Sequence, residues 1–374
     1  MTQPNRHRAL YASAAWTIAW LALFDLGTSL AVRAVAARNP ASGLVRYFEY
    51  GRSTESKLDR TLAQPVDSAD ALVERAGWLD PTEWASLPDR PGPGANALVA
   101  VYGQSFAANA TIEAARLDGH LTLRLIGGPA APADHSHAIF VLDAPLRKAD
   151  VVVMGVLASS VARIGAMSQV SYSFEQPAPY TFPHYTVSDG ELHAEAPAFT
   201  SEAEFRRAFS TRSSEWDRFK DQLAANDRGF DRIAFDRTPL DASQLVLLMR
   251  RGWVAHHQNY EDGVRDPRSG FNPNAEPVRV LNALLRDASR RARARNERLI
   301  VLLEHDRGYA DHLYKAVAGT LQAENIEFVS SHTLFSSSDP ANFIANGHYT
   351  DAANQKFALA LARLIRLRPA AGRR

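Results

Sequence analysis

The chain has 374 residues, enough for one large domain or two modest ones. Its 46% apolar and 22% charged residues are typical of a globular protein and exclude a largely disordered chain. The 42 basic and 41 acidic residues give a formal net charge of +1, so the overall charge does not favour a nucleic-acid partner. Cysteine is absent, which excludes disulfides, thiolate catalysis and cysteine zinc sites.

Residues 9–32 form an apolar run whose one charged residue is Asp25. A membrane-spanning helix needs about 20 apolar residues, whereas the core of a cleaved signal peptide has about 7–15. We therefore expect residues 1–38 to form an uncleaved signal anchor. The sequence "AVAA" at 34–37 fits a signal cleavage site, so a cleaved leader stays an alternative, as does a buried core helix.

The charges around this run do not settle its orientation. Taken alone, the positive-inside rule would hold the large domain in the cytoplasm, because the arginines that follow the run are Arg33, Arg38, Arg46 and Arg52. That rule is weak for long translocated domains, and we expect the large domain outside the cytoplasm. Asp25 is costly within a span unless it faces a partner helix or lies near the interface.

Residues 39–95 are rich in proline, serine, aspartate and arginine, and we expect a linker with one or two short helices, for example near 68–79. After this region, strand-type and helix-type segments alternate. Strands are predicted at 97–103, 121–128, 149–160, 298–305 and 326–331, and helices at 109–117, 276–296, 309–325 and 350–367.

This alternation predicts an α/β fold, a three-layer sandwich with a central parallel sheet and helices on both faces. The predicted domain covers residues 96–370. Residues 165–275 interrupt the alternation, contain a helix-type segment at 202–223, and are predicted to form an insertion beside the active face. The insertion contains aromatic side chains that could stack on sugar rings or form a local core, namely Tyr172, Phe174, Tyr180, Phe182 and Tyr185.

Ser105 follows the first predicted strand at its carboxyl end, the edge where parallel sheets bind ligands. A serine after a tight turn can act as a nucleophile, and the next helix supplies N–H groups for an oxyanion. It can equally be a helix cap. The choice depends on a base elsewhere in the chain, and His348 lies in the loop before the final helix, which opens on the same sheet edge. This agreement favours a Ser–His pair.

The stretches "YGQSF" (102–106) and "NGHYTDAANQKFA" (346–358) resemble the first and last blocks of the SGNH (GDSL-type) hydrolase superfamily. The resemblance covers residues 97–367 in architecture and these two blocks in motif. In that superfamily the first block reads Gly-Asp-Ser, and Gln104 stands here in place of the aspartate. The usual acid of the last block lies three residues before the histidine, where this chain has Ala345.

A branch of the superfamily that includes exopolysaccharide O-acetylation proteins has Asp-x-His in its last block, and Asn346 occupies that acid position here. An asparagine can accept the imidazole N–H and fix its tautomer, but it supplies no negative charge. Asp339 and Asp351 are the nearby carboxylates that could supply one.

The resemblance also implies oxyanion or substrate-binding groups from the second and third blocks. Gly127 and Gly128 follow the second strand. The third block lacks its usual Gly-x-Asn, so Ser159, Ser160 or a backbone N–H would have to substitute, and Arg163 could bind an anionic substrate group or form a surface ion pair.

Other polar clusters receive simpler interpretations. The histidines at 134–137 and 256–257 lack metal-ligand spacing, although His135 or His137 could line the pocket. The basic run at 286–299 is interpreted as the solvated face of a helix. Glu304 and Asp306 end the fourth strand, where either could contact substrate or Asp306 could cap a helix. Nucleotide-binding motifs are absent, so no cofactor is expected.

These observations predict a membrane-anchored serine esterase or O-acyltransferase that acts on a carbohydrate ester, such as an O-acetyl group on an envelope polysaccharide or exopolysaccharide. The alternative is a catalytically degenerate domain that binds a polysaccharide or the partner proteins of an envelope assembly. The degraded blocks favour the alternative, and the retained Ser–His pair favours the enzyme.

Overall fold

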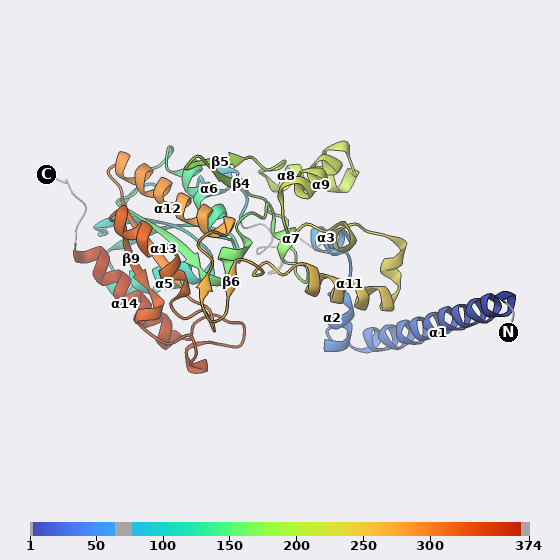
Figure 1. Cartoon of the computed structure of the whole chain (residues 1–374). Helices are drawn as coiled ribbons and strands as arrows, with labels where there is room; N and C mark the ends of the chain where they lie inside the picture. The colour runs from blue at the N-terminus through green and yellow to red at the C-terminus, as the bar shows by residue number, and fades with distance from the viewer. Residues whose placement is uncertain (1–2, 64–76, 368–374) are drawn as a thin grey trace. The chain divides into compact units, whose positions relative to one another are not determined.

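The computed structural model of the protein describes residues 3–63 and 77–367. It divides into two compact units, drawn together in Figure 1. Unit 1 contains the described residues among Met1–Gln64, Ser173–Pro177 and Phe230–Asn259. Unit 2 contains the rest. Unit 1 thus joins the N-terminal segment to residues from the middle of the chain, a grouping that the sequence patterns do not indicate.

Unit 2 is built on a five-stranded sheet with all its neighbouring strands parallel. Its order is β2-β1-β3-β8-β9, which numbered within this sheet is the flavodoxin-like order 2-1-3-4-5. The strands are β1 (Ala97–Tyr102), β2 (Leu121–Ile126), β3 (Val151–Leu157), β8 (Arg298–Glu304) and β9 (Glu327–Ser330). The predicted α/β fold with a central parallel sheet is confirmed.

One face of this sheet is covered by α5 (Ser105–Asp118) and α14 (Asp351–Leu367), which pack against each other. Alternate strand residues such as Val101 and Val153 point to this side and form one core with the apolar faces of both helices. In Figure 1 the two helices lie below the sheet. Because each helix begins at the carboxyl-end edge of the sheet, the first turns of both helices lie at that edge.

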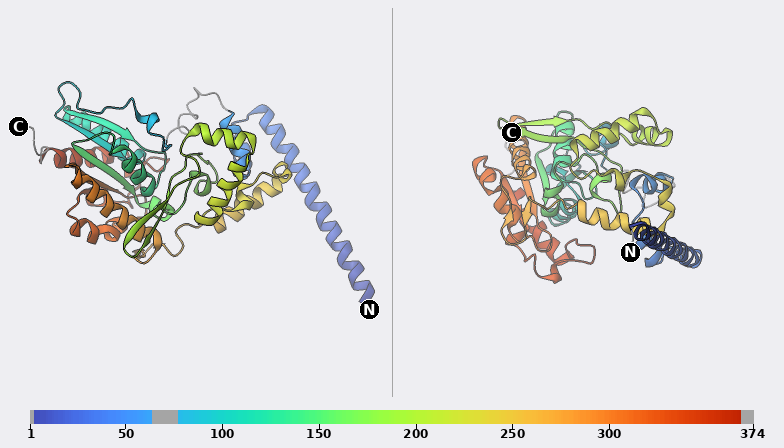
Figure 2. Two further views of the ribbon diagram at one scale, coloured as in Figure 1. Left: turned by 90° about the horizontal axis from the view of Figure 1, so that it is seen from above. Right: turned by 45° about the vertical axis from the view of Figure 1, so that its right-hand side comes forward.

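The other face is covered by α6 (Ala133–Asp143), α12 (Glu276–Ala294) and α13 (His312–Ala323). Figure 2 shows α12 and α13 with the sheet from a second direction. The helix α6 is absent from the sequence prediction, because its buried residues on all sides leave no amphipathic period to detect.

The insertion adds short elements to the side of unit 2. The predicted helix at 202–223 is two helices, α8 (Glu202–Thr211) and α9 (Ser214–Asn226), because Arg212 adopts a left-handed conformation with φ of 48° and ends the first. The remaining elements of unit 2 are η1 (Pro81–Trp84), η2 (Ala158–Arg163), α7 (Gln169–Tyr172), β4 (His184–Ser188), β5 (Glu191–Glu195), β6 (Arg265–Asp266), β7 (Gly270–Phe271), η4 (Ser331–Thr333) and η5 (Pro340–Asn342).

The five aromatic side chains proposed for sugar stacking are all buried. Tyr180 and Phe182 have no exposed surface and pack against His135 on α6. A ring face covered by protein cannot stack on a sugar, so the expectation that these rings bind substrate is wrong. Phe174 packs in unit 1 with Ala234 and Val254, and the other four rings are part of the interior of unit 2.

Unit 1 contains α1 (Gln3–Arg38), α2 (Gly43–Glu49), α3 (Thr54–Leu62), α10 (Arg232–Phe235), η3 (Pro239–Ala242) and α11 (Gln244–His257). Its centre is a buried polar network in which Asp241 accepts hydrogen bonds from Ser53 and Ser56, both at 2.6 Å, and pairs with Arg250. Within α1, Leu10–Arg38 is long and apolar enough to cross a membrane. The helix predicted near 68–79 lies largely outside the described residues.

Candidate active site

Ser105 is the first residue of α5, and Gln104 is its N-cap. The strand β1 ends at Tyr102, so the chain turns from strand to helix within Gly103 and Gln104. This turn leaves the serine hydroxyl partly exposed at the carboxyl-end edge of the sheet. The first N–H groups of a helix have no partners within the helix, so donors for a negative charge lie next to the hydroxyl.

His348 lies in a loop that a tight turn holds in place. The turn spans Ile344 to Gly347, with Gly347 at a φ of 89°, a conformation that favours glycine. The backbone N–H of Ile344 donates to the carbonyl of His348 at 2.9 Å. The next residue, Tyr349, is buried, and its hydroxyl donates to the carbonyl of His305 at 2.9 Å. The histidine is therefore fixed from both sides.

The structure brings the three predicted side chains together. The Ser105 Oγ lies 2.6 Å from His348 Nε2, and His348 Nδ1 lies 3.1 Å from the Asn346 side-chain oxygen. That same oxygen accepts the backbone N–H of His348 at 3.2 Å, which identifies it as the oxygen of the amide. Since an amide oxygen only accepts, Nδ1 carries the proton and Nε2 is free to accept from the serine. This is the arrangement of a nucleophile and its base.

Phe106 restrains the imidazole further. Its ring stacks on the His348 ring with centroids 4.7 Å apart and planes 15° apart. The same phenyl ring meets Tyr349 edge-on at 4.9 Å. Sequence reasoning did not identify this role for Phe106, although the residue directly follows the serine. This stacking covers one face of the imidazole and holds the orientation of the ring relative to Ser105.

Asn346 is the residue that orients the ring, because neither alternative carboxylate does. Asp339 accepts the N–H of Ala341 and caps η5, and Asp351 is exposed at the start of α14. Among residues 3–63 and 77–367, no ion pair of either aspartate with His348 is present. The imidazole is thus oriented by a neutral acceptor.

A buried pair of polar side chains lies next to the nucleophile. The Gln104 side-chain amide donates to Glu304 Oε2 at 2.7 Å. Gln104 is 3% exposed and Glu304 is fully buried, and burial raises the pKa of Glu304 well above its ordinary value. Burial therefore favours the neutral form of Glu304, and the prediction that it contacts substrate is not supported by its burial.

Gly127 lies close to the turn that holds Ser105. A Cβ atom at this position would come within 1.8 Å of the Gly103 carbonyl oxygen, so only glycine allows the two chains to pass. Gly128 is buried beneath His135 and Tyr180. Of the two predicted glycines, Gly127 is the one that adjoins the strand-to-helix turn of the nucleophile.

The third-block candidates already have other partners. The backbone N–H of Ser159 donates to Asp306 at 2.8 Å, and the Ser160 hydroxyl donates to the Leu157 carbonyl at 2.7 Å. Arg163 lies over the ring of Tyr172, 5.2 Å from its centroid. Asp306 accepts from Ser159 and does not cap α13, whose N-cap is Asp311. The roles predicted for these residues stay predictions.

A groove of about 670 Å³ begins at His348 and Phe106 and continues between the outer faces of α5 and α14. Its walls are mainly polar. Exposed amide side chains come from Asn109 and Gln355, and the remaining lining residues are Ile112, Glu113, Arg116, Tyr349, Asp351, Ala352 and Asn354. The polar run "YTDAANQ" at the start of the last helix is the sequence signal that could have identified this groove.

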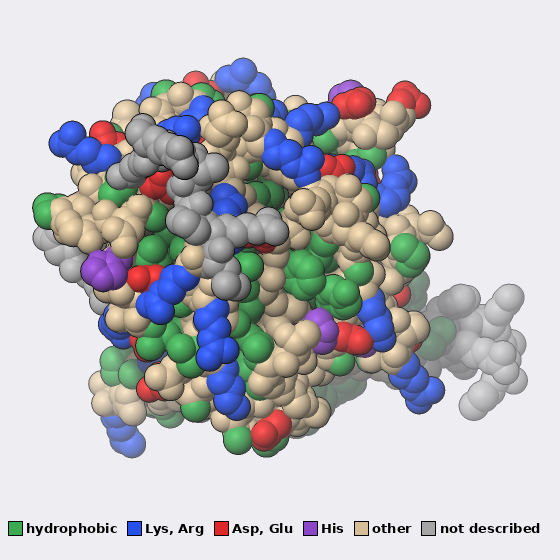
Figure 3. Space-filling view, turned by 90° about the vertical axis from the view of Figure 1, so that its left-hand side faces the viewer, with side chains coloured by type: hydrophobic (Ala, Val, Ile, Leu, Met, Phe, Trp, Pro, Cys, Tyr) green, Lys and Arg blue, Asp and Glu red, His purple; other side chains and the backbone are tan. Residues whose placement is uncertain are grey.

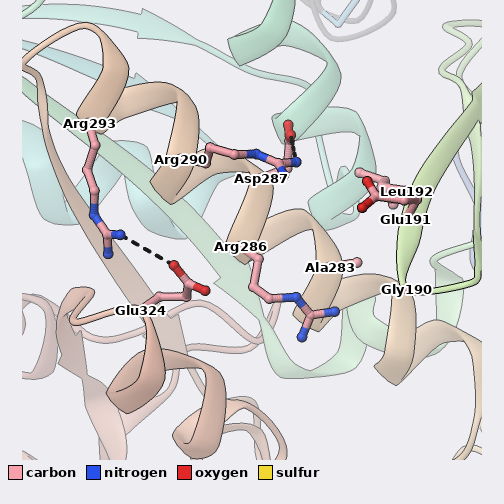
Figure 4. A pocket seen from close by; sticks show the side chains of 9 residues that line it. All are labelled: Gly190, Glu191, Leu192, Ala283, Arg286, Asp287, Arg290, Arg293 and Glu324. Carbon is pink, nitrogen blue, oxygen red and sulfur yellow. Dashed lines mark hydrogen bonds and ion pairs between the residues drawn. The ribbon is translucent and has the colours of Figure 1, made fainter.

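A second hollow of about 470 Å³ lies on α12 beside β5, and Figure 4 shows its lining. Arg290 pairs with Asp287 at 2.9 Å, and Arg293 pairs with Glu324 at 3.5 Å. Arg286 also points into the hollow. These arginines belong to the predicted basic run and lie on the exposed side of α12. The lining also holds three carboxylates, Glu191, Asp287 and Glu324, so the hollow carries no net charge and does not select anions by charge alone.

The histidines of α6 lie in the interior of unit 2, whereas those at 256–257 are exposed on α11 in unit 1. His135 Nε2 bonds the Gly77 carbonyl at 2.6 Å, and His137 Nε2 bonds Asp287 at 2.9 Å. Burial lowers the pKa of His135 to about 4, so this ring is neutral. Within the part of the chain that the structure describes, no group of three or more metal-ligating side chains is present. On the face shown in Figure 3, basic and acidic side chains are interspersed.

No family model matches the sequence, and no curated protein does. Among solved structures, the chain is similar to a candidate acylhydrolase from Bacteroides fragilis, with 11% sequence identity and a TM-score of 0.35. The similarity covers 76% of this chain and 93% of that one. At this level of similarity the assignment of a reaction has to rest on the side chains of the site.

Proposed function

We propose that the protein is a serine-dependent esterase or O-acyltransferase. The observation that carries the proposal is the chain of contacts from Ser105 to His348 to Asn346 at 2.6 and 3.1 Å. Both distances lie within the range of productive proton transfer and its orienting bond. The pair stands at the sheet edge where α/β folds place their sites.

The proposed reaction has two acyl-transfer steps. His348 Nε2 takes the Ser105 hydroxyl proton as Oγ attacks the ester carbonyl carbon, and the carbonyl oxygen becomes an oxyanion. The free N–H groups at the start of α5 stabilise that charge. The C–O bond of the ester then breaks, the leaving alkoxide takes the proton from His348, and the acyl group stays on Oγ. Water or a second hydroxyl, deprotonated by His348, then attacks the acyl carbonyl carbon. The bond to Oγ breaks, and Oγ takes the proton back from His348, which releases the acyl group.

The polar groove supports a polyhydroxylated substrate, and we propose a carbohydrate ester. Amide and carboxylate side chains such as Asn109, Glu113 and Gln355 offer donors and acceptors along a surface that begins at the base. With α1 as the membrane anchor and unit 2 outside the cytoplasm, the substrate would be a polysaccharide of the cell envelope. An acetyl group is the acyl group that the superfamily resemblance suggests.

The test uses the full chain in detergent with p-nitrophenyl acetate as substrate. We expect Ser105→Ala to lower kcat/KM by at least about 10³-fold, because the nucleophile is removed. Ser210→Ala, at an exposed serine on α8, should leave turnover unchanged. A fluorophosphonate should also label the wild-type chain at Ser105, as read from the modified peptide mass. Equal turnover by wild type and Ser105→Ala would reject the enzyme and favour the polysaccharide-binding alternative.

A further inference from the structure

The helix α1 changes character at Asp25. From Leu10 to Phe24 every residue is exposed, including bulky apolar side chains such as Trp16 and Trp20, at 68% and 66%. From Asp25 onward a stripe of less exposed residues appears at helical spacing, namely Asp25, Thr28, Ser29, Val32, Val35 and Ala36. The first stretch therefore faces no protein in the described structure, whereas the second packs on the rest of unit 1.

The partner of this stripe is α11. The Asp25 carboxylate accepts the backbone N–H of Leu245 at 2.7 Å, in the first turn of α11. A carboxylate there satisfies an unpaired helix donor and interacts favourably with the helix dipole. Further along, Leu247 and Val32 join one buried cluster with Val45 and Phe48. Asp25 is thus a docking contact between α1 and unit 1.

We infer that the bilayer ends at Asp25, and that η3 and the start of α11 lie on the lipid surface. The uncharged stretch from residue 9 to residue 24 is about 24 Å long at 1.5 Å per residue. Arg6 and Arg8 precede it in the sequence. This length is about 6 Å less than the usual hydrocarbon thickness of about 30 Å, a mismatch that a bilayer accommodates by thinning locally.

The span of residues 9–32 predicted from sequence is inconsistent with this packing. It would place Asp25 about 10 Å inside the hydrocarbon, with the first turn of α11 and the irregular segment before it. Non-helical backbone exposed to lipid does not occur within the hydrocarbon region, because its polar groups have no partners. A boundary at Asp25 places these groups in the headgroup layer, where water and lipid headgroups solvate them.

The direction of α11 identifies the second lipid contact. Leu245 meets Asp25 and Leu247 joins the cluster of Val32, so α11 and α1 leave the boundary together. The segment η3, which directly precedes α11, therefore lies level with Asp25, at the boundary of the bilayer. Its Leu240 is 59% exposed. An apolar side chain at that depth contacts acyl chains or headgroups, so the occupant of this surface is the lipid bilayer itself.

Because the chain has no cysteine of its own, a single introduced cysteine can be labelled without background reaction. Single-cysteine variants of the full chain are made at exposed positions: Ala22→Cys within the proposed span, Leu30→Cys beyond it, Leu240→Cys on η3 and Leu44→Cys on α2 as a control. Each is labelled with bimane and placed in nanodiscs with or without brominated lipids, which quench bimane in the acyl region. A membrane-impermeant maleimide is applied to unlabelled samples.

We expect lipid quenching at positions 22 and 240 and none at 30 and 44. We also expect cysteine 30 to react with the maleimide at least roughly tenfold faster than cysteine 22. Quenching at 30 equal to that at 22 would overturn the boundary. Absence of bimane quenching at position 240 would overturn the lipid contact. Protection of cysteine 240 from the maleimide in native membranes, but not in nanodiscs, would also overturn it, in favour of a protein partner. No readout uses ester turnover, so the result is independent of the proposed reaction.

Discussion

Gln104, which directly precedes the serine, donates its side-chain amide to Glu304 across 2.7 Å in the protein interior. The bond ties the turn that presents Ser105 to the carboxyl end of β8. Glu304 therefore brings a buried acidic group from another strand to the residue that precedes the serine.

Glu304→Gln should make the stability of the folded protein fall less as pH rises. Burial raises the pKa of Glu304 above its unfolded value, so its stabilising effect is complete below about pH 4.5 and is lost as pH rises toward the folded-state pKa. The loss is up to about 1.4 kcal/mol per pH unit, and glutamine does not ionise. Thermal unfolding of both chains at pH 5, 7 and 9 measures this. The exposed control Glu191→Gln should show no such gain in stability at high pH. If the Tm values of Glu304→Gln and wild type fall equally between pH 5 and 9, the prediction is contradicted.

Variants of Asn346 should separate the effect of orienting the His348 imidazole from the effect of a negative charge beside it. Asn346→Ala removes the acceptor of the imidazole N–H, and we expect kcat to fall roughly 10- to 100-fold with KM little changed. Asn346→Asp keeps the acceptor and adds a charge that favours the protonated ring, so the acidic limb of the activity profile should move to higher pH. Rates between pH 5 and 9 measure both effects. Asn325→Asp adds the same charge at the other edge of the sheet, and a similar shift there would count against a local role.

Gly127→Ala should disturb both the fold and the site. Its Cβ atom would meet the Gly103 carbonyl oxygen at 1.8 Å, so the backbone of one strand end must move. We expect a destabilisation of about 1–3 kcal/mol and a loss of turnover, because Gly103 leads directly to Ser105. Gly319→Ala, within α13 and without atoms near its Cβ position, should be neutral or stabilising. Urea unfolding and ester turnover check the pair, and a Gly127→Ala chain as stable and active as wild type would refute this account.

Groove variants should distinguish substrates by size. Gln355→Ala and Asn109→Ala remove exposed amides that line the groove, so KM for an acetylated oligosaccharide should rise several-fold. Turnover of p-nitrophenyl acetate should stay the same, because that ester is too small to use the groove. Gln322→Ala, an exposed amide on α13, is the control. Equal effects on both substrates would mean that these side chains act on the catalytic residues and not on binding.

Sequence periodicity predicted the parallel sheet because fully buried strands such as β3 are continuous apolar runs with clear ends. It placed Ser105 and His348 at one sheet edge because parallel topology alone requires this. It could not predict α6, where burial on all sides removes the amphipathic signal, or the buried state of the aromatic side chains near 180. Hydropathy shows that a segment is apolar, but it does not show which surface covers it.

The partners that support the site are equally invisible in the sequence. Gln104 and Glu304 are separated by 200 residues, and each has an ordinary surface-type side chain. The pairing of Asp25 with Leu245 joins a span-like helix to a segment 220 residues later. Such contacts depend on tertiary packing, for which one sequence holds no local pattern.

The separation of Asp25 from Leu245 also sets an order of events during synthesis. At 5–20 residues per second, the start of α11 leaves the ribosome roughly 10–40 s after Asp25 does. Throughout that interval the helix α1 is complete while its carboxylate has no backbone donor to bind. Unit 1 closes only when Phe230–Asn259 has been made, after β1 to β5 of unit 2 have already emerged. The surface of α11 that docks on α1 is therefore made long after α1 itself.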